Sequence, residues 1–256
     1  MQDRYAGDIG DFGKYGLLRW LCGDDEHGPA LKLGVLWYRV PNEKGNNDGS
    51  HTGYVHSDPG AGFQECDKEL FRIMKSIVCE GKRTIGEVEV SGALPTETFC
   101  HSDPLCYVPR EPRPEREERR CRWIAEGRRR VIGAQLVFAD PDNGLQTEGV
   151  ARHEMRGRKY AYYDDLAPLV ERGQSLVVYH HLGRQDHKVQ IKARLEDLRE
   201  RLPHASGAFG LRFRRGTARA FLVLPTSQHA EVLRARAETL LDSAWGINEH
   251  FDRKIY

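Results

Sequence analysis

The 256-residue sequence predicts an α/β protein with a Rossmann-like, mostly parallel sheet and an antiparallel hairpin strand near the C-terminus. Short apolar runs in the second half are typical of buried strands, and they alternate with segments that have apolar residues at helical spacing. The last two runs are joined by the tight connection Arg214–Thr217, which favours a hairpin. At 39% hydrophobic residues, the chain can bury a sizeable core. We expect one domain over residues 1–256, with a Pro/Arg-rich insertion around residues 95–130.

The first half contains fewer clear elements. The residue patterns predict helices over Lys14–Cys22 and Asp67–Cys79 and strands over Leu33–Val40 and Thr84–Val90. Prolines interrupt the segment Tyr107–Glu118, and a basic helix is expected to follow over Arg119–Arg130.

The second half predicts the order strand, helix, strand, helix, strand, hairpin strand, helix, which is the order of an α/β sheet. Pro168 fits the first of these helices only if it lies in the first turn, and Ser227 or Thr226 is expected to cap the last helix. The predicted strands are Gly133–Ala139, Ser175–His180, Gly207–Phe213 and Ala218–Leu224, and the predicted helices are Tyr162–Arg172, Asp186–Arg201 and Ser227–Asp242.

Composition excludes several classes of protein. The longest apolar run is far shorter than the ~18–20 residues of a membrane span, and no secretory signal is present, so we expect a cytoplasmic protein. The six cysteines form no CxxC pair and are expected to be reduced thiols. A zinc site would need Cys100, His101, Cys106 and Cys121, which lack the usual paired spacing, so no metal is expected.

The net charge of +1 conceals two basic stretches. Arg110–Arg130 has nine arginines against five glutamates, and Arg184–Arg219 has ten Lys or Arg against four acids. Such stretches are compatible with nucleic acid as the partner, DNA more than RNA, and Arg128, Arg129 and Arg184 are candidate phosphate-binding residues. Solvated helix faces are the alternative explanation.

Polar clusters follow two of the predicted strands, where α/β sheets bind their ligands. Asp140, Asp142 and Asn143 come directly after one strand, and Asp48 and His51 lie in the long polar loop after Leu33–Val40. These groups could accept protons or hold an exocyclic amine, although turns rich in Asp, Asn and Gly also occur for conformational reasons and the loop could be a mobile tip.

A pair of histidines, His180 and His181, ends the strand Ser175–His180. Adjacent strand residues point to opposite faces, so at most one of them would face a shared pocket. We take His180 as a candidate substrate-binding residue, with a packing or capping role as the alternative.

The N-terminal segment places four glycines at intervals of three from Gly7 to Gly16. Asp8, Asp11 and Lys14 would then stand on a tight turn, where backbone and ammonium groups could meet a ligand. The structural alternative is a helix start with Asp11 as its N-cap. Stacking on an extruded base is expected from Tyr5, Tyr15, Trp37 and Tyr54.

The opening YAGDIGDFGKYGLL, the strand-ending DPDNG and the later element order resemble the J-type large-subunit rRNA adenine-N6 methyltransferases. The resemblance implies that Lys14 matches the lysine that ends their first motif, and that Asp140 and Pro141 match the first half of their D-P-P-Y motif. It covers most of the chain in order but few residues in identity.

Two departures from that family stand out. Arg39–Gly45 replaces the glycine-rich cofactor turn, and Asp142 and Asn143 replace the proline and the aromatic residue of the motif. We therefore expect a retained scaffold with changed chemistry and no cofactor. The combination GDIGDFGKYGLLR, NNDGSH and DPDNG also resembles an uncharacterised bacterial group associated with phage defence, which includes enzymes that excise modified bases.

Four functions fit these observations. The preferred one is a cofactor-independent DNA glycosylase, which cleaves the N-glycosidic bond of a modified base with the carboxylates and polar groups named above. The alternatives are an S-adenosylmethionine-dependent adenine-N6 methyltransferase, a metal-dependent nuclease and a nucleic-acid-binding module without catalysis. The sequence predicts no oligomeric state.

Overall fold

The computed structural model describes residues 1–23, 30–43, 45–56 and 62–252. The main strands are β1 (Leu33–Leu36), β2 (Phe99–His101), β3 (Leu136–Ala139), β6 (Ser175–His181), β7 (Phe209–Phe213) and β8 (Arg219–Leu224). The longer helices are α1 (Ile9–Cys22), α3 (Lys68–Cys79), α5 (Arg113–Arg130), α6 (Tyr163–Glu171), α7 (His187–Arg201) and α8 (Ala230–Asp242). The smaller elements are α2 (Phe63–Cys66), α4 (Ile85–Val90), α9 (Ala244–Ile247), β4 (Gly144–Leu145), β5 (Tyr160–Ala161) and the 3₁₀ turns Asp3–Tyr5, Gly53–Val55 and Gly157–Lys159.

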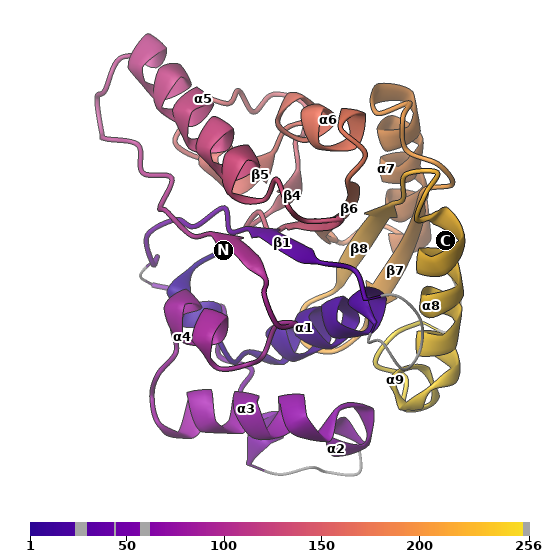
Figure 1. Cartoon of the computed structure of the whole chain (residues 1–256). Helices are drawn as coiled ribbons and strands as arrows, with labels where there is room; N and C mark the ends of the chain where they lie inside the picture. The colour runs from indigo at the N-terminus through magenta and orange to yellow at the C-terminus, as the bar shows by residue number, and fades with distance from the viewer. Residues whose placement is uncertain (24–29, 44, 57–61, 253–256) are drawn as a thin grey trace.

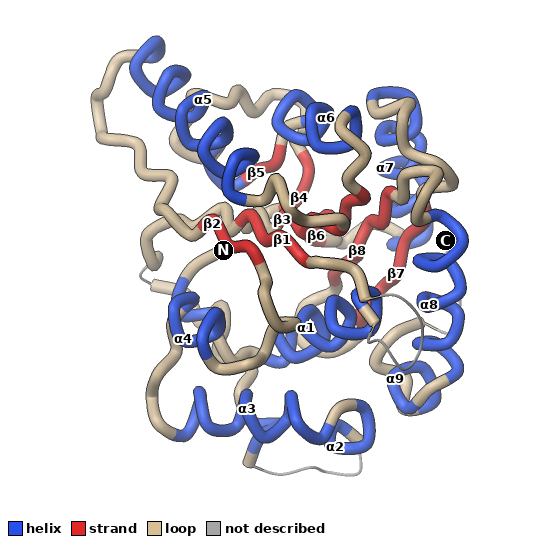
Figure 2. Tube along the Cα trace, viewed as in Figure 1, coloured by secondary structure: helices blue, strands red, loops and turns tan. Residues whose placement is uncertain are grey.

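Six strands form one sheet in the order β2-β1-β3-β6-β8-β7 (Figure 2). The first four pair in parallel, whereas β8 runs antiparallel to both β6 and β7. Because β7 therefore points the same way as β6, the turn between β7 and β8 lies at the edge where the parallel strands end. This arrangement confirms the predicted α/β class with a reversed strand near the sheet edge.

Helices cover both faces of the sheet (Figure 1). Strand residues alternate between two apolar clusters, so Val35 packs in the cluster of α1, α3 and α8, while its neighbour Leu36 packs in the cluster of α5, α6 and α7. Since both faces are covered, the central strands are apolar at every position, as the pattern LVFA of β3 shows.

The N-terminal helix starts earlier than the sequence predicts. It begins at Ile9 rather than Lys14, and its N-cap is Asp8 rather than Asp11. Oδ1 of Asp8 accepts a hydrogen bond from the amide of Gly10 at 2.8 Å. Of the four glycines that suggested a broken start, Gly10, Gly13 and Gly16 lie within this helix, and Gly7 precedes it. The lack of a side chain lets other groups approach closely: a Cβ on Gly13 would lie 2.3 Å from the Phe213 ring.

The segment predicted as a strand over Thr84–Val90 is the helix α4. Thr84 Oγ1 accepts a hydrogen bond from the amide of Glu87 at 3.1 Å, which caps the helix. Ile85 and Val88, three residues apart, are both buried. The β-branched composition was misleading because the capping residue and the i, i+3 spacing determine the local structure.

The segment 95–130 contributes two regular elements to the fold. It forms the edge strand β2, which the sequence did not reveal, and α5, which starts at Arg113 rather than Arg119. Pro112 is the N-cap residue of α5 and Pro114 lies in its first turn, where a missing N–H breaks no helical hydrogen bond. The prolines therefore start this helix rather than prevent it.

Pro168 lies inside α6 and not in its first turn. A proline there leaves the carbonyl of Asp164 without its helical N–H partner, and Arg128 on α5 donates to that carbonyl instead.

At helix α8 neither Ser227 nor Thr226 is the cap, because α8 begins after His229 without a side-chain cap. Strand β1 ends at Leu36, short of Val40. Among the described helices, none combines the length and apolarity that crossing a membrane requires.

Candidate functional site

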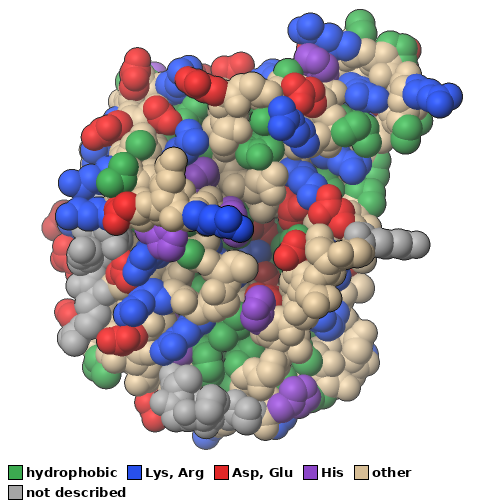
Figure 3. Space-filling model, turned by 180° about the vertical axis from the view of Figure 1, so that it is seen from behind, with side chains coloured by type: hydrophobic (Ala, Val, Ile, Leu, Met, Phe, Trp, Pro, Cys, Tyr) green, Lys and Arg blue, Asp and Glu red, His purple; other side chains and the backbone are tan. Residues whose placement is uncertain are grey.

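A cavity of about 360 Å³ lies at the edge of the sheet where β1, β3 and β6 end. On the face shown in Figure 3, acidic side chains gather in a hollow bordered by Lys, Arg and His side chains. The cavity is lined by Met1, Tyr5, Asp8, Asp11, Lys14, Glu43, Asp48, Gly49, His51, Asp140, Pro141, Asp142, Asn143, Lys159, Tyr179, His181, Thr217 and Arg219. Six carboxylates are thus gathered with three basic side chains, excluding histidines, around one volume.

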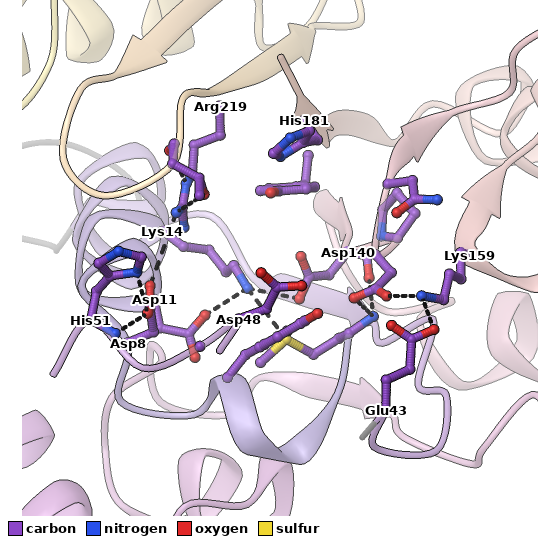
Figure 4. A pocket seen from close by; sticks show the side chains of 18 residues that line it. Asp8, Asp11, Lys14, Glu43, Asp48, His51, Asp140, Lys159, His181 and Arg219 are labelled. Carbon is purple, nitrogen blue, oxygen red and sulfur yellow. Dashed lines mark hydrogen bonds and ion pairs between the residues drawn. The ribbon is translucent and has the colours of Figure 1, made fainter. Parts of the chain in front are cut away.

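The ammonium group of Lys14 lies at the centre of the floor (Figure 4). Its Nζ donates to Asp11 Oδ1 at 2.9 Å and to Asp140 Oδ2 at 2.8 Å. The second oxygen of Asp11 accepts a hydrogen bond from the Tyr15 hydroxyl at 2.9 Å. Helix α1 supplies Lys14 and Asp11, and the end of β3 supplies Asp140, so the sheet topology itself assembles this group.

Burial and charge oppose each other in this buried group. Burial alone would lower the pKa of Lys14, but the carboxylates of Asp11 and Asp140 outweigh it and raise the pKa. Burial also raises the pKa of the Asp11 carboxyl, against the opposing effect of Lys14. Lys14 is therefore a permanent cation at neutral pH, and its amine is not free to act as a nucleophile.

Asp142 forms the second group of charges. Its carboxylate accepts from Gln2 Nε2 at 3.0 Å and pairs with Lys159 Nζ at 3.1 Å, and Lys159 also pairs with Glu43. Burial would raise the pKa of Asp142, but the amino group of Met1 and Lys159 lower it overall. Among the described residues, Oδ1 of Asp142 accepts no hydrogen bond. This oxygen is buried and lies 3.7 Å from the amino group of Met1.

The opposite side of the cavity is formed by His51, Asp8 and Arg219. His51 Nδ1 lies 3.5 Å from Asp8 Oδ2, and the His51 amide donates to the same oxygen at 2.9 Å. Arg219 at the start of β8 lies 4.0 Å from Asp8 Oδ1. Asp8 thus caps α1 and also orients His51 at the cavity mouth.

The structure brings His181 to the cavity, and not His180. His180 is buried on the other face of the strand, where its Nδ1 accepts from the amide of Leu145 at 3.2 Å. Burial lowers its pKa to about 3, with a smaller effect from Arg194. The sequence had limited the choice to one of the two histidines, and the strand alternation selects the one that shares a face with Tyr179.

All eight predicted catalytic residues line this cavity, although they come from three segments far apart in the sequence: Asp8, Asp11, Lys14, Asp48, His51, Asp140, Asp142 and Asn143. Of the predicted stacking residues only Tyr5 lines it. Tyr15, Trp37 and Tyr54 are buried in the core, and the Tyr54 hydroxyl donates to the Gly7 carbonyl at 3.2 Å.

The three predicted phosphate-binding arginines lie outside the cavity lining. Arg128 donates to the carbonyls of Asp164 and Asp165, and Arg129 pairs with Glu126. Both stand at the end of α5 that precedes β3, which is the edge of the sheet opposite to Asp140. Arg184 is exposed in the loop after β6, at the same edge as the cavity.

Six lining residues of functional character were not selected from the sequence: Glu43, Lys159, Tyr179, His181, Thr217 and Arg219. Tyr179 and His181 could have been found from the period of two along β6. Arg219 and Thr217 follow from the predicted hairpin, whose turn had to lie at the carboxyl edge of the sheet. Lys159 has no comparable local signal, because its position depends on the short β4–β5 pairing.

Two observations bear on cofactors and metals. Where methyltransferases have a glycine-rich turn after the first strand, this chain has the fully buried Trp37 and Tyr38, and the amino group of Met1 donates to the Tyr38 carbonyl at 2.8 Å. Within the described part of the chain, no group of three or more His, Cys, Asp or Glu side chains is arranged to hold a metal ion.

No protein-family model matches the chain, and no curated protein is significantly similar to it. The sheet topology and the cavity by themselves define the class: a Rossmann-like α/β protein with an acidic pocket at the carboxyl edge of its sheet.

Proposed function

We propose that this protein is a DNA glycosylase that hydrolyses the N-glycosidic bond of a modified base without a cofactor. The observation that carries the proposal is the cavity floor, where two carboxylates share a single buried cation, Lys14. The resemblance to the phage-defence group that excises modified bases supports the same reading of DPDNG and GDIGDFGKYGLLR.

Glycosidic cleavage develops positive charge on the sugar ring. Lys14 lies between Asp11 and Asp140, so with both carboxylates ionised this part of the floor is negative overall. Fixed negative charge stabilises an oxocarbenium-like transition state. Tyr15 and Lys14 hold the carboxylates in place, so little reorganisation is needed when the charge forms.

The remaining groups can complete the reaction. As the bond between C1′ and the base nitrogen breaks, a water oxygen bonds to C1′ and its proton passes to a carboxylate of the cavity lining, for which Asp142 is the candidate. The departing base takes a proton at the cavity mouth, where His51 is held by Asp8. Tyr5, which lines the cavity together with Tyr179, is the predicted stacking residue in contact with it.

The charge state of Lys14 predicts the type of glycosylase. Some glycosylases use an amine to form a covalent imine with the sugar and then cut the strand; a lysine whose pKa is raised by two carboxylates cannot start that reaction. We expect an abasic site in an uncut strand as the product.

The test is incubation of the whole protein with duplex and single-stranded DNA containing modified cytosines, followed by alkaline cleavage at abasic sites. Cleavage should appear only after alkali, without trapping of a protein–DNA adduct by borohydride. It should fall at least ~100-fold in Asp140→Asn, whereas Asp164→Asn, an exposed carboxylate on α6, should behave as the unmodified protein.

Failure to form abasic sites on every DNA tested would contradict the proposal. Two other outcomes would replace it: micromolar binding of S-adenosylmethionine in calorimetry would indicate a methyltransferase, and strand cuts that need Mg²⁺ and no alkali would indicate a nuclease.

A further inference from the structure

Three donors on one side of the cavity, Arg219, Thr217 and His181, are not used by the chemistry proposed above. Arg219 is 7% exposed, whereas Thr217 and His181 are exposed. His181 and Arg219 are direct cross-strand partners in the pairing of β6 with β8, so their side chains project from the same face of the sheet. In Figure 4, both lie on the side of the cavity away from Glu43 and Lys159.

The guanidinium group of Arg219 is held in place with donors to spare. Its Nε donates to the Thr217 carbonyl at 3.0 Å and its Nη2 to Thr217 Oγ1 at 2.7 Å. Among the described residues, Nη1 donates no hydrogen bond. Nη2 also lies 4.0 Å from Oδ1 of Asp8, an ion pair that is too long for a hydrogen bond and that does not involve Nη1.

A glycine in α1 makes room for this guanidinium. A Cβ on Gly10 would lie 1.2 Å from Nη1 of Arg219, so the group rests directly on the first turn of the helix. The positive end of a helix dipole is an unfavourable place for a cation, and it favours an anion. Within the part of the chain that the structure describes, the cation has one anionic partner, Asp8 at 4.0 Å, and its unused Nη1 leaves it able to bind a further anion from the cavity that Arg219 lines.

We propose that Arg219, Thr217 and His181 form a phosphate-binding subsite, which holds the phosphate next to the nucleoside whose base enters the acidic floor. Guanidinium, hydroxyl and imidazole groups are the side chains that bind phosphate oxygens, and the carboxylates of the floor repel a phosphate from the rest of the cavity. The identity of the nucleoside rests on the proposed function, whereas the phosphate subsite rests on the contacts of Arg219.

The subsite predicts which ligands the protein distinguishes. By calorimetry, 5′-deoxycytidine monophosphate should bind at least ~10-fold more tightly than deoxycytidine, and inorganic phosphate should compete with it. A dinucleotide with a phosphodiester should bind more tightly than its neutral methylphosphonate analogue by a similar factor. This comparison shows whether the subsite accepts a diester as well as a monoester.

Two variants and a matched control make the test specific. In Arg219→Met the preference for the monophosphate should fall to about 1. Gly10→Ala favours the helix but displaces the guanidinium, so it should lower the preference while α1 stays folded. Arg214→Met removes an arginine of the same hairpin that pairs with Glu249 and does not line the cavity, and it should keep the full preference.

A preference near 1 in the unmodified protein, or one that survives in Arg219→Met, would overturn the subsite. The result is independent of the glycosylase assay. Abasic-site formation without any phosphate preference would leave the proposed function standing alone, and a lost preference in Arg219→Met without cleavage of any DNA would leave only the subsite.

Discussion

Lys14 connects stability and function at the scale of single residues. It is 3% exposed and binds two carboxylates that are themselves buried, so every charge of the group depends on the others. Removing one partner of a buried ion pair leaves an uncompensated charge, which costs more than the pair contributes when intact.

We therefore predict that Lys14→Met lowers the free energy of unfolding by about 3–5 kcal/mol at pH 7. Burial raises the pKa of Asp11 and Lys14 opposes this effect, so without the ammonium group the folded-state pKa of Asp11 would rise further above that of the unfolded chain. The folded variant then binds extra protons as the pH falls, so the loss should shrink between pH 7 and pH 5. Urea unfolding at both pH values measures this.

Lys32→Met is the control for this variant, because Lys32 is exposed and lies 3.9 Å from Glu97 at the surface. It should change stability by less than about 0.5 kcal/mol. An equal loss in Lys14→Met at pH 7 and pH 5 would show that the carboxylates are not the cause.

His180 predicts a second pH effect. Its pKa is about 3 in the folded protein because of burial, and 6.5 is the ordinary value. Below pH 6.5 the unfolded chain binds a proton that the folded chain does not, so stability falls as the pH drops from 6.5 toward 3, by up to about 1.4 kcal/mol per pH unit.

His180→Asn isolates this contribution, since the asparagine oxygen can accept the hydrogen bond from Leu145. Burial also lowers the pKa values of His101 and His229, and these residues act in the same direction in both proteins. Unfolding curves at pH 7, 6 and 5 should diverge, with the variant losing less stability. Parallel losses would contradict the assignment.

At the scale of elements, the structure assigns Arg128 a role that its charge alone did not indicate. The sequence suggested a phosphate contact, but Arg128 instead donates to the carbonyl of Asp164, which Pro168 leaves without a helical partner. We predict that Arg128→Ala destabilises the protein by about 1 kcal/mol.

The prediction is tested by a double-mutant cycle with Pro168→Ala, which restores an N–H to bond that carbonyl within α6. In that background the cost of Arg128→Ala should fall by about 0.5–1 kcal/mol. Additive effects of the two changes would show that Arg128 does not compensate for the proline. Urea unfolding of the four proteins supplies the data.

The elements also show where sequence patterns succeed. The strands β3, β6, β7 and β8 were predictable because each is a short apolar run in a sheet that helices cover on both faces. Two predictions were wrong because of local hydrogen bonds. Thr84 caps α4, which makes that segment helical, and Asp8 caps α1, which places the start of that helix earlier than predicted. The two-residue strands β4 and β5 have no signal of their own.

The same contrast holds for the site at the scale of the whole molecule. Asp140 and Asp48 could be placed together from the sequence because the parallel sheet brings the ends of its strands to one edge, whereas Lys14 was selected from its glycine-rich segment and the family resemblance. The presence of Lys159 in the cavity and the absence of Arg128 from its lining could not be predicted, since both depend on loop packing. Topology thus predicts which edge carries the site, and tertiary contacts decide which basic residues serve it.

This distinction predicts which edge of the molecule binds DNA. Arg184 and Arg129 are both exposed arginines, but Arg184 follows the end of β6 at the cavity edge, whereas Arg129 precedes β3 at the opposite edge. A phosphate contact contributes to the salt dependence of binding through counterion release. Arg184→Ala should therefore weaken binding of a single-stranded oligonucleotide and reduce the slope of log K against log salt by about 1.

Arg129→Ala should leave both unchanged, because this side chain is paired with Glu126 far from the cavity. Fluorescence anisotropy between 50 and 200 mM salt, a range in which such slopes are resolved, measures both variants. A larger effect of Arg129→Ala would place the nucleic acid on α5 and separate it from the acidic cavity.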